Sequence, residues 1–139
     1  MPRSSSSRLH SGLPLEPRTL TVALGAARCT VGAVLLLAPR SVPRLLGVDP
    51  ISARQMDWTA RMAGGRDLIV GIGTLIAPER SRGQWVLAGV GSDATDAFAL
   101  IRAATQGHLG RVRGVLAAAS GVAAALTGAS LLASSRAQR

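Results

Sequence analysis

Four apolar segments, each long enough to cross a bilayer, constrain this chain more than any other feature. They cover residues 19–38, 59–77, 85–104 and 114–133. A helix of about 20 residues rises about 30 Å, which matches the hydrocarbon thickness of a membrane. Short connections between such segments place successive helices side by side in opposite directions. The sequence therefore predicts an all-α fold, a four-transmembrane-helix antiparallel bundle.

The segments outside the four predicted spans are polar or mixed. Residues 1–17 are rich in Ser and Pro, which predicts a disordered N-terminal tail, and residues 136–139 form a C-terminal tail. Residues 40–57 mix apolar and charged side chains, and their prolines limit any helix to about two turns. We expect a short interfacial segment there, resting on the bilayer. The stretch PERSRG at 78–83 is predicted to be a tight turn.

The composition also favours a membrane domain at 18–135. Hydrophobic residues make up 47% of the chain but aromatic residues only 2%, whereas soluble cores rely on aromatic bulk. A soluble bundle would need a polar face on each helix, and the span 114–133 offers only Ser120, Thr127 and Ser130. We expect a multi-pass protein of the bacterial plasma (inner) membrane. Seven Arg on the side of the termini against six on the other predict cytoplasmic termini.

The remaining composition excludes several classes of site. The net charge is +9 and all 16 basic residues are Arg, but they are scattered, whereas a nucleic-acid site needs them clustered. Nucleic acid is therefore not an expected partner. The single cysteine, Cys29, cannot form an internal disulfide. His10 and His108 lie far apart in the chain, so neither a metal site nor a cofactor is expected.

Leaving aside Arg102 at the rim of the third span, six ionisable residues fall inside the first three spans, which is unusual for membrane helices. Each one costs about 2.5–3.5 kcal/mol at mid-bilayer on insertion scales. Arg61 lies near the start of its span, where it can reach the surface and bond Asp57. The other five cannot escape in this way, and unpaired they would cost on the order of 12–17 kcal/mol. The sequence therefore predicts that they pair with one another.

Depth along the helices supports this pairing. At 1.5 Å per residue, all five charges fall in one layer about 5 Å thick. We predict that Arg28 pairs with Asp93 on the third span. Arg66 is predicted to pair with Asp96, and Asp67 to bridge or accept a hydrogen bond.

Small residues accompany these charges. Gly25 and Gly32 share a helix face with Arg28, which makes room for a partner helix. The last span carries a stripe of small residues, typical of close packing between membrane helices. This stripe is predicted either to close the bundle or to form a homodimer seam. It consists of Gly114, Ala118, Gly121, Ala125 and Gly128.

Three stretches resemble a known family. They are LGAARCTVGAVLLLAPRSVPRLLGV around Arg28, ARMAGGRDLIVGIGTL around Arg66 and Asp67, and DATDA with Asp93 and Asp96. Together they resemble small bacterial four-helix integral membrane proteins of unknown function, common in actinobacteria and loosely similar to DoxX-like proteins. The resemblance covers about residues 19–105. It implies the four-helix membrane fold and the charged positions, and it implies no activity.

The charges support two functional hypotheses. In the first, the chain is a structural or partner-binding membrane protein, and the buried pairs fix the helix register. In the alternative, it is a small transporter or a lipid- or ligand-binding protein that uses Asp93 and Asp96, since charges inside a membrane often mark functional sites. No catalytic residue is identified, and enzyme chemistry is the least favoured class. The expected partners are the lipid bilayer and either further copies of the chain or other membrane proteins.

Overall fold

The computed structural model describes residues 16–137, with side chains described as far as residue 134. Within this part of the chain the regular structure is helical, without strands, which confirms the predicted all-α class. The described helices are α1 (Pro17–Leu37), α2 (Ser41–Leu45), α3 (Pro50–Gln55), α4 (Asp57–Ile76), α5 (Glu79–Thr105) and α6 (Arg111–Ala137).

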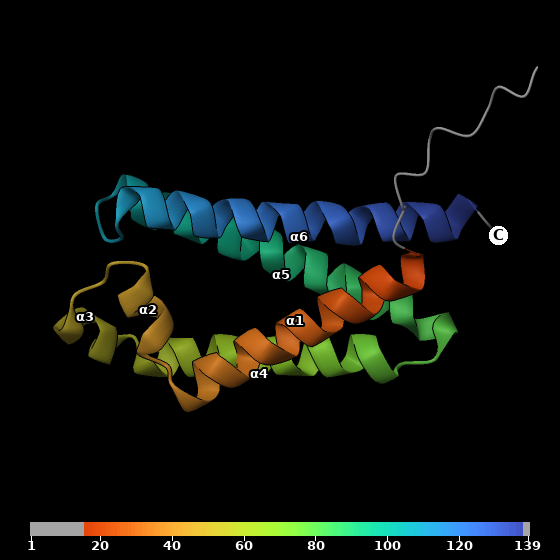
Figure 1. The fold of residues 1–139 in the computed structure, drawn as a ribbon, viewed down its shortest axis with the longest axis horizontal. Helices are drawn as coiled ribbons and strands as arrows, with labels where there is room; N and C mark the ends of the chain where they lie inside the picture. Colours follow the sequence, from red (N-terminus) through yellow and green to blue (C-terminus); the bar gives the residue numbers. More distant parts are fainter. Residues whose placement is uncertain (1–15, 138–139) are drawn as a thin grey trace, which may run out of the picture.

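The four long helices form two pairs (Figure 1). Helix α1 packs along α4, and α5 packs along α6, whereas contacts between the pairs are made mainly by α4 with α5. The short helices α2 and α3 lie at one end, beside the turn between α5 and α6. The start of α1 and the end of α6 lie together at the opposite end.

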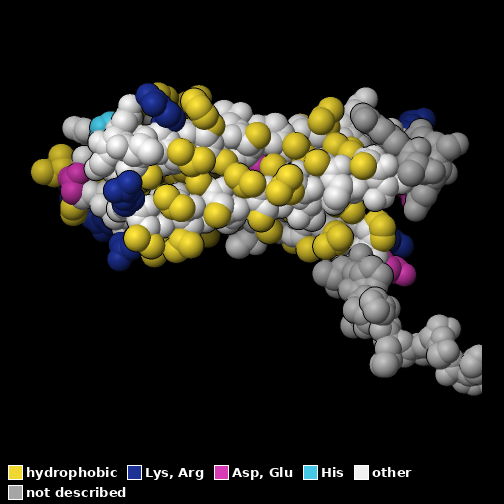
Figure 2. Space-filling view, turned by 90° about the horizontal axis from the view of Figure 1, so that it is seen from above, with side chains coloured by type: hydrophobic (Ala, Val, Ile, Leu, Met, Phe, Trp, Pro, Cys, Tyr) yellow, Lys and Arg dark blue, Asp and Glu magenta, His cyan; other side chains and the backbone are white. Residues whose placement is uncertain are grey.

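Two helices are long and apolar enough to cross a membrane. They are Pro17–Leu37 and, within α6, Arg111–Ser134. Four such spans were predicted, but α4 and α5 carry most of the internal charges, which lower their mean hydropathy. Figure 2 shows hydrophobic side chains along the whole of one face, with basic side chains gathered toward the ends of the molecule.

Several helix boundaries differ by a few residues from the approximate bounds predicted from the sequence. Helix α1 begins at Pro17, inside the predicted tail, because proline suits the first turn of a helix. The rest of that predicted tail, residues 1–15, lies outside the described residues. Helix α5 begins at Glu79, directly after Pro78, so PERSRG is not a tight turn but mostly the first turn of a helix. An acidic residue there interacts favourably with the helix dipole.

The C-terminal boundary also differs from the prediction. Helix α6 continues to Ala137, so the first half of the predicted tail at 136–139 is helical. Residues 138–139 lie outside the described part of the chain.

The connection between α1 and α4 contains the two short helices α2 and α3, in agreement with the limit of two turns predicted from its prolines. The carboxylate of Asp49 caps α3 by accepting hydrogen bonds from the backbone amides of Ile51 and Ser52. Hydrogen bonding from Ser52 also holds the pKa of Asp49 below its usual value. Val48 and Ala53 pack on Leu109 in a small buried core. This core anchors the connection to the turn between α5 and α6.

Glycine permits the close approach inside each helix pair. A Cβ added at Gly32 would lie 2.7 Å from the carbonyl oxygen of Gly64, and one at Gly25 would lie 3.2 Å from that of Gly71. The predicted stripe on α6 faces α5 within the same chain. Its glycines contact α5 or the turn that follows it: Gly114 lies against Ala104 and Leu109, Gly121 against Ala97 and the Asp93 carbonyl, and Gly128 against Val86 and Val90.

Candidate functional site between the two helix pairs

The five predicted charges meet between the helix pairs, and the predicted partners are confirmed. Arg28 Nη2 lies 2.5 Å from Asp93 Oδ2, and Arg66 Nη2 lies 2.6 Å from Asp96 Oδ2. Arg66 also donates through Nη1 to the other Asp96 oxygen, at 3.2 Å. This is the two-pronged arrangement that a planar guanidinium forms best with a carboxylate.

Asp67 lies between the two pairs, as predicted. Its Oδ1 atom is 3.5 Å from Arg28 Nη1 and 3.4 Å from Arg66 Nη2. Both distances are long for charge-assisted hydrogen bonds, which usually measure about 2.7–2.9 Å. Asp67 is nevertheless among the most buried polar residues described, at 8% exposed. Asp67 is therefore a buried carboxylate whose negative charge is only weakly neutralised by the two arginines.

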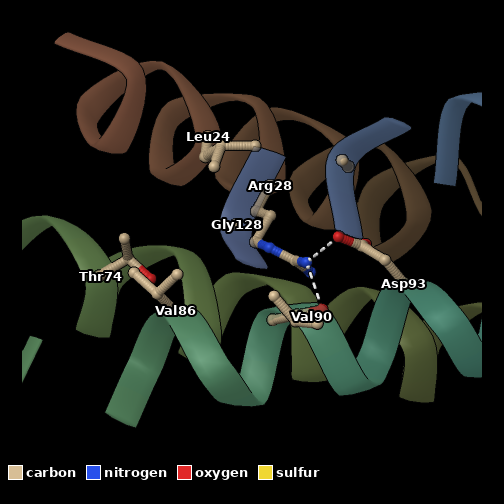
Figure 3. Close-up of a pocket in the computed structure, with 9 residues that line it drawn as sticks. Leu24, Arg28, Thr74, Val86, Val90, Asp93 and Gly128 are labelled. Atoms are coloured by element: carbon tan, nitrogen blue, oxygen red, sulfur yellow. Dashed lines mark hydrogen bonds and ion pairs between the residues drawn. The ribbon is translucent and has the colours of Figure 1, made fainter. Parts of the chain in front are cut away.

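The absence of a side chain at Gly89 makes room for the Arg28 guanidinium. Figure 3 shows the Arg28 side chain reaching past Gly128 and Val90 toward Asp93. Its Nη2 atom also donates to the carbonyl oxygen of Gly89, at 2.7 Å. A Cβ at Gly89 would lie 2.9 Å from the same nitrogen. Helix periodicity could not indicate that the backbone of Gly89 would bind Arg28.

The two ion pairs differ in burial. The side chains of Arg28 and Asp93 are 12% and 16% exposed, whereas those of Arg66 and Asp96 are 37% and 44% exposed. The Nε atom of Arg66 is buried and has no hydrogen-bond partner among the described residues. The Arg28 pair is thus the inner one, and the Arg66 pair lies at the edge of the cluster.

A cavity of about 540 Å³ adjoins the cluster. Pockets of about 300–1,000 Å³ are typical of small-molecule sites. Its polar wall includes Arg28 and the three carboxylates, and its remaining walls are mainly apolar. The apolar lining comes from all four long helices and from α2 with its C-cap: Leu24, Ala27, Val31, Leu35, Val42, Leu46, Ala63, Ala99, Leu100, Ala117 and Ala124. No feature of the sequence predicted this cavity, because it arises from the spacing of the two pairs.

A much smaller cavity lies beside Arg28. It has a volume of about 10 Å³, close to the minimum that a single water molecule requires. Leu24, Thr74, Val86 and Gly128 line it together with Arg28 (Figure 3). It is too small for an organic ligand, unlike the larger cavity.

The prediction that Arg61 forms a hydrogen bond with Asp57 is wrong. Arg61 donates instead to the carbonyl oxygen of Leu36, near the end of α1. Asp57 accepts two hydrogen bonds from Arg40, both at 3.1 Å, because the connection folds back and presents Arg40 to the start of α4. The Arg40 guanidinium lowers the pKa of Asp57 below its ordinary value. Helix periodicity could not predict this contact, since an irregular segment separates Arg40 from Asp57.

The geometry limits the chemistry of the site. Among the described residues no group of three or more His, Cys, Asp or Glu side chains is arranged to hold a metal ion. The carboxylates are instead engaged with guanidinium groups, and a void with apolar walls lies against them. Such an arrangement can link helices, and it can hold an amphipathic molecule.

Comparisons of the chain with protein-family models, with curated proteins and with solved structures yield no match.

Proposed function

We propose that this chain is an integral membrane protein with four membrane-spanning helices, α1, α4, α5 and α6, and that it binds an amphipathic small molecule in the cavity between the helix pairs. The apolar surface supports the membrane location. Each long helix exposes large apolar side chains, among them Leu37 at 85%, Ile76 at 76%, Phe98 at 66% and Leu126 at 66%. Exposure of such an apolar surface to water is unfavourable, whereas its contact with lipid acyl chains is not.

The charges on α4 and α5 are compatible with this location. Arg66 and Asp96 pair with each other, and Asp93 pairs with Arg28 of α1. Pairing within the protein is how membrane helices carry ionisable residues. The same features are those on which the resemblance to small four-helix membrane proteins rests, so membership of that family is part of the proposal.

The cavity is the single observation that carries the ligand-binding proposal. Its size suits a small molecule, and its polar wall consists of the charged residues that the sequence singled out. A purely structural cluster does not require a hollow of this size beside it. A molecule with an apolar body and a polar head would fill the void and meet the cluster.

A structural role is the second candidate, and one observation favours it. Few close contacts join the helix pairs besides those of α4 with α5, yet the charge cluster links α1, α4 and α5. The cluster can therefore fix how the pairs are placed relative to each other. The partly exposed Arg66–Asp96 pair could also meet a partner membrane protein.

Two measurements test the proposal. Alkaline carbonate extraction of membranes should leave the full chain in the pellet, and recovery in the aqueous fraction would contradict the membrane location. Native mass spectrometry of the detergent-purified chain should then detect a co-purified small molecule. Ala117→Leu, which narrows the cavity, should abolish that adduct.

Ala119→Leu is the matched control, since Ala119 lies on the same helix outside the cavity lining. It should retain the adduct. If neither the wild-type chain nor the control carries a bound molecule, and amphiphiles added to the purified chain also fail to bind, the structural role stands alone.

A further inference from the structure

The charge cluster contains one more acid than base. Its acids are Asp67, Asp93 and Asp96, and its bases are Arg28 and Arg66. Each Arg has one close carboxylate partner, at 2.5 or 2.6 Å, and these two pairs balance. The surplus negative charge therefore belongs to Asp67, whose contacts with the guanidinium groups are 3.4 and 3.5 Å long.

The position of Asp67 makes this surplus costly. The residue is buried on α4 and lines the cavity of about 540 Å³. A buried carboxylate without full compensation is unfavourable, because low-dielectric surroundings do not replace its hydration. Arg61, the other Arg within α4, donates to the Leu36 carbonyl and is not a partner of Asp67. A positive charge that enters the cavity would complete the cluster.

The apolar walls of the cavity indicate the chemistry of the rest of the ligand. Val31 and Leu35 of α1 and Leu100 of α5 contribute apolar surface beside the charged wall. A small inorganic cation would leave this apolar volume empty. A molecule with an ammonium group and an alkyl or ring body would satisfy both parts of the cavity.

We propose that the cavity selects amphipathic organic cations, with the ammonium group against Asp67 and the apolar body between α1, α5 and α6. This inference rests on the proposed ligand-binding function and adds the chemical class of the ligand. Asp67 is the selecting residue. Asp93 and Asp96 stay with their Arg partners.

Photoreactive probes with matched decyl chains test this selection. Three probes carry a trimethylammonium, a sulfate or a maltoside head, and each has a diazirine at the end of the chain. The full-length protein is labelled in neutral detergent, and the modified residues are mapped by peptide mass spectrometry. We expect the ammonium probe to label cavity-lining residues about tenfold more than the sulfate probe, equal to about 1.4 kcal/mol.

Variants assign the preference to Asp67. Asp67→Asn should reduce the ratio of ammonium to sulfate labelling to near one, because both close ion pairs remain while the surplus charge is removed. Asp67→Glu should keep the preference. Asp57→Asn removes a carboxylate outside the cavity lining and should leave labelling unchanged. The preference measured on the wild-type chain remains a test even if Asp67→Asn fails to fold.

The outcomes distinguish a failure of the proposed cation selection from a failure of the proposed ligand binding. If none of the probes labels the cavity, the ligand-binding function fails. If the probes label it equally, binding stands and the selection of cations is wrong, as expected if one carboxyl of the cluster carries a proton instead. If Asp67→Asn folds and keeps the preference, the assignment to Asp67 is wrong.

Discussion

Arg28 of α1 forms an ion pair with Asp93 of α5 at 2.5 Å, across a boundary where the two helices have few other close contacts. The pair is largely buried, with side chains 12% and 16% exposed. The same guanidinium nitrogen donates to the Gly89 carbonyl at 2.7 Å. One arginine thus connects the α1–α4 pair to the α5–α6 pair through two groups on a single turn of α5.

We expect Asp93→Asn to destabilise the folded chain by about 3–5 kcal/mol, because it leaves the Arg28 guanidinium buried without its close partner. Arg28→Gln should cost a similar amount for the same reason. The double variant should lose less than the sum of the two single losses, since it removes both charges. Unfolding in mixed detergent micelles, followed by tryptophan fluorescence, measures these differences. Additive losses would show that the pair contributes no coupling.

We expect Gly89→Ala to weaken this connection, because the added methyl group would lie 2.9 Å from Arg28 Nη2. The guanidinium must shift, with a cost of about 1 kcal/mol typical of mild overpacking. The cost should vanish when Arg28 is also replaced by Ala. Gly91→Ala is the matched control on the same helix, since a Cβ there meets no atom within 4 Å. An equal loss in both glycine variants would contradict the expected contact.

The sequence predicted the charge cluster well for a physical reason. Because the rise per residue of a helix is known, the position of a residue in each antiparallel helix gives its depth in the membrane. Five charges at one depth therefore had few possible partners other than one another. Boundaries were less predictable, because local signals at Pro17, Pro78 and Glu79 decide where a helix begins. The predicted turn at 78–83 failed for that reason.

The cavity and the Arg40–Asp57 contact could not be predicted in the same way. Both depend on how far apart the helix pairs lie and on how an irregular segment folds back. Periodicity indicates which face of a helix is apolar but not the distance to the next helix. Likewise, the glycine stripe on α6 was compatible with two neighbours, and its packing on α5 of the same chain emerged only from the tertiary structure.

We expect Gly64→Ala to destabilise the α1–α4 pair by about 1–3 kcal/mol. A Cβ at this position would lie 2.7 Å from the Gly32 carbonyl oxygen, and backbone atoms cannot move aside cheaply. Gly65→Ala is the matched control at the next position, where a Cβ meets no atom within 4 Å. It should be neutral or stabilising, because alanine favours the helix by about 0.5–1 kcal/mol. Thermal unfolding of both variants in detergent would refute the proposed contact if their order were reversed.

We expect the Arg40–Asp57 contact to stabilise the chain in a pH-dependent way. Its arginine lowers the pKa of Asp57 from the ordinary 3.8, so the folded state binds a proton less readily than the unfolded state. The stabilisation is therefore fully present above that ordinary value and is lost as the pH falls through the lowered pKa of the folded state. The measurement is the difference in thermal midpoint between the wild-type chain and Asp57→Asn.

That difference should be constant from about pH 5 to pH 7 and should shrink toward zero below about pH 4. The other carboxylates titrate in both proteins, so the comparison cancels their contribution, including that of the capping residue Asp49. Arg40→Gln should reduce the midpoint above pH 5 in the same direction, because Asp57 then lacks its partner. A difference that persists unchanged to the lowest pH would mean that Asp57 acts through something other than its charge, such as its place in the first turn of α4.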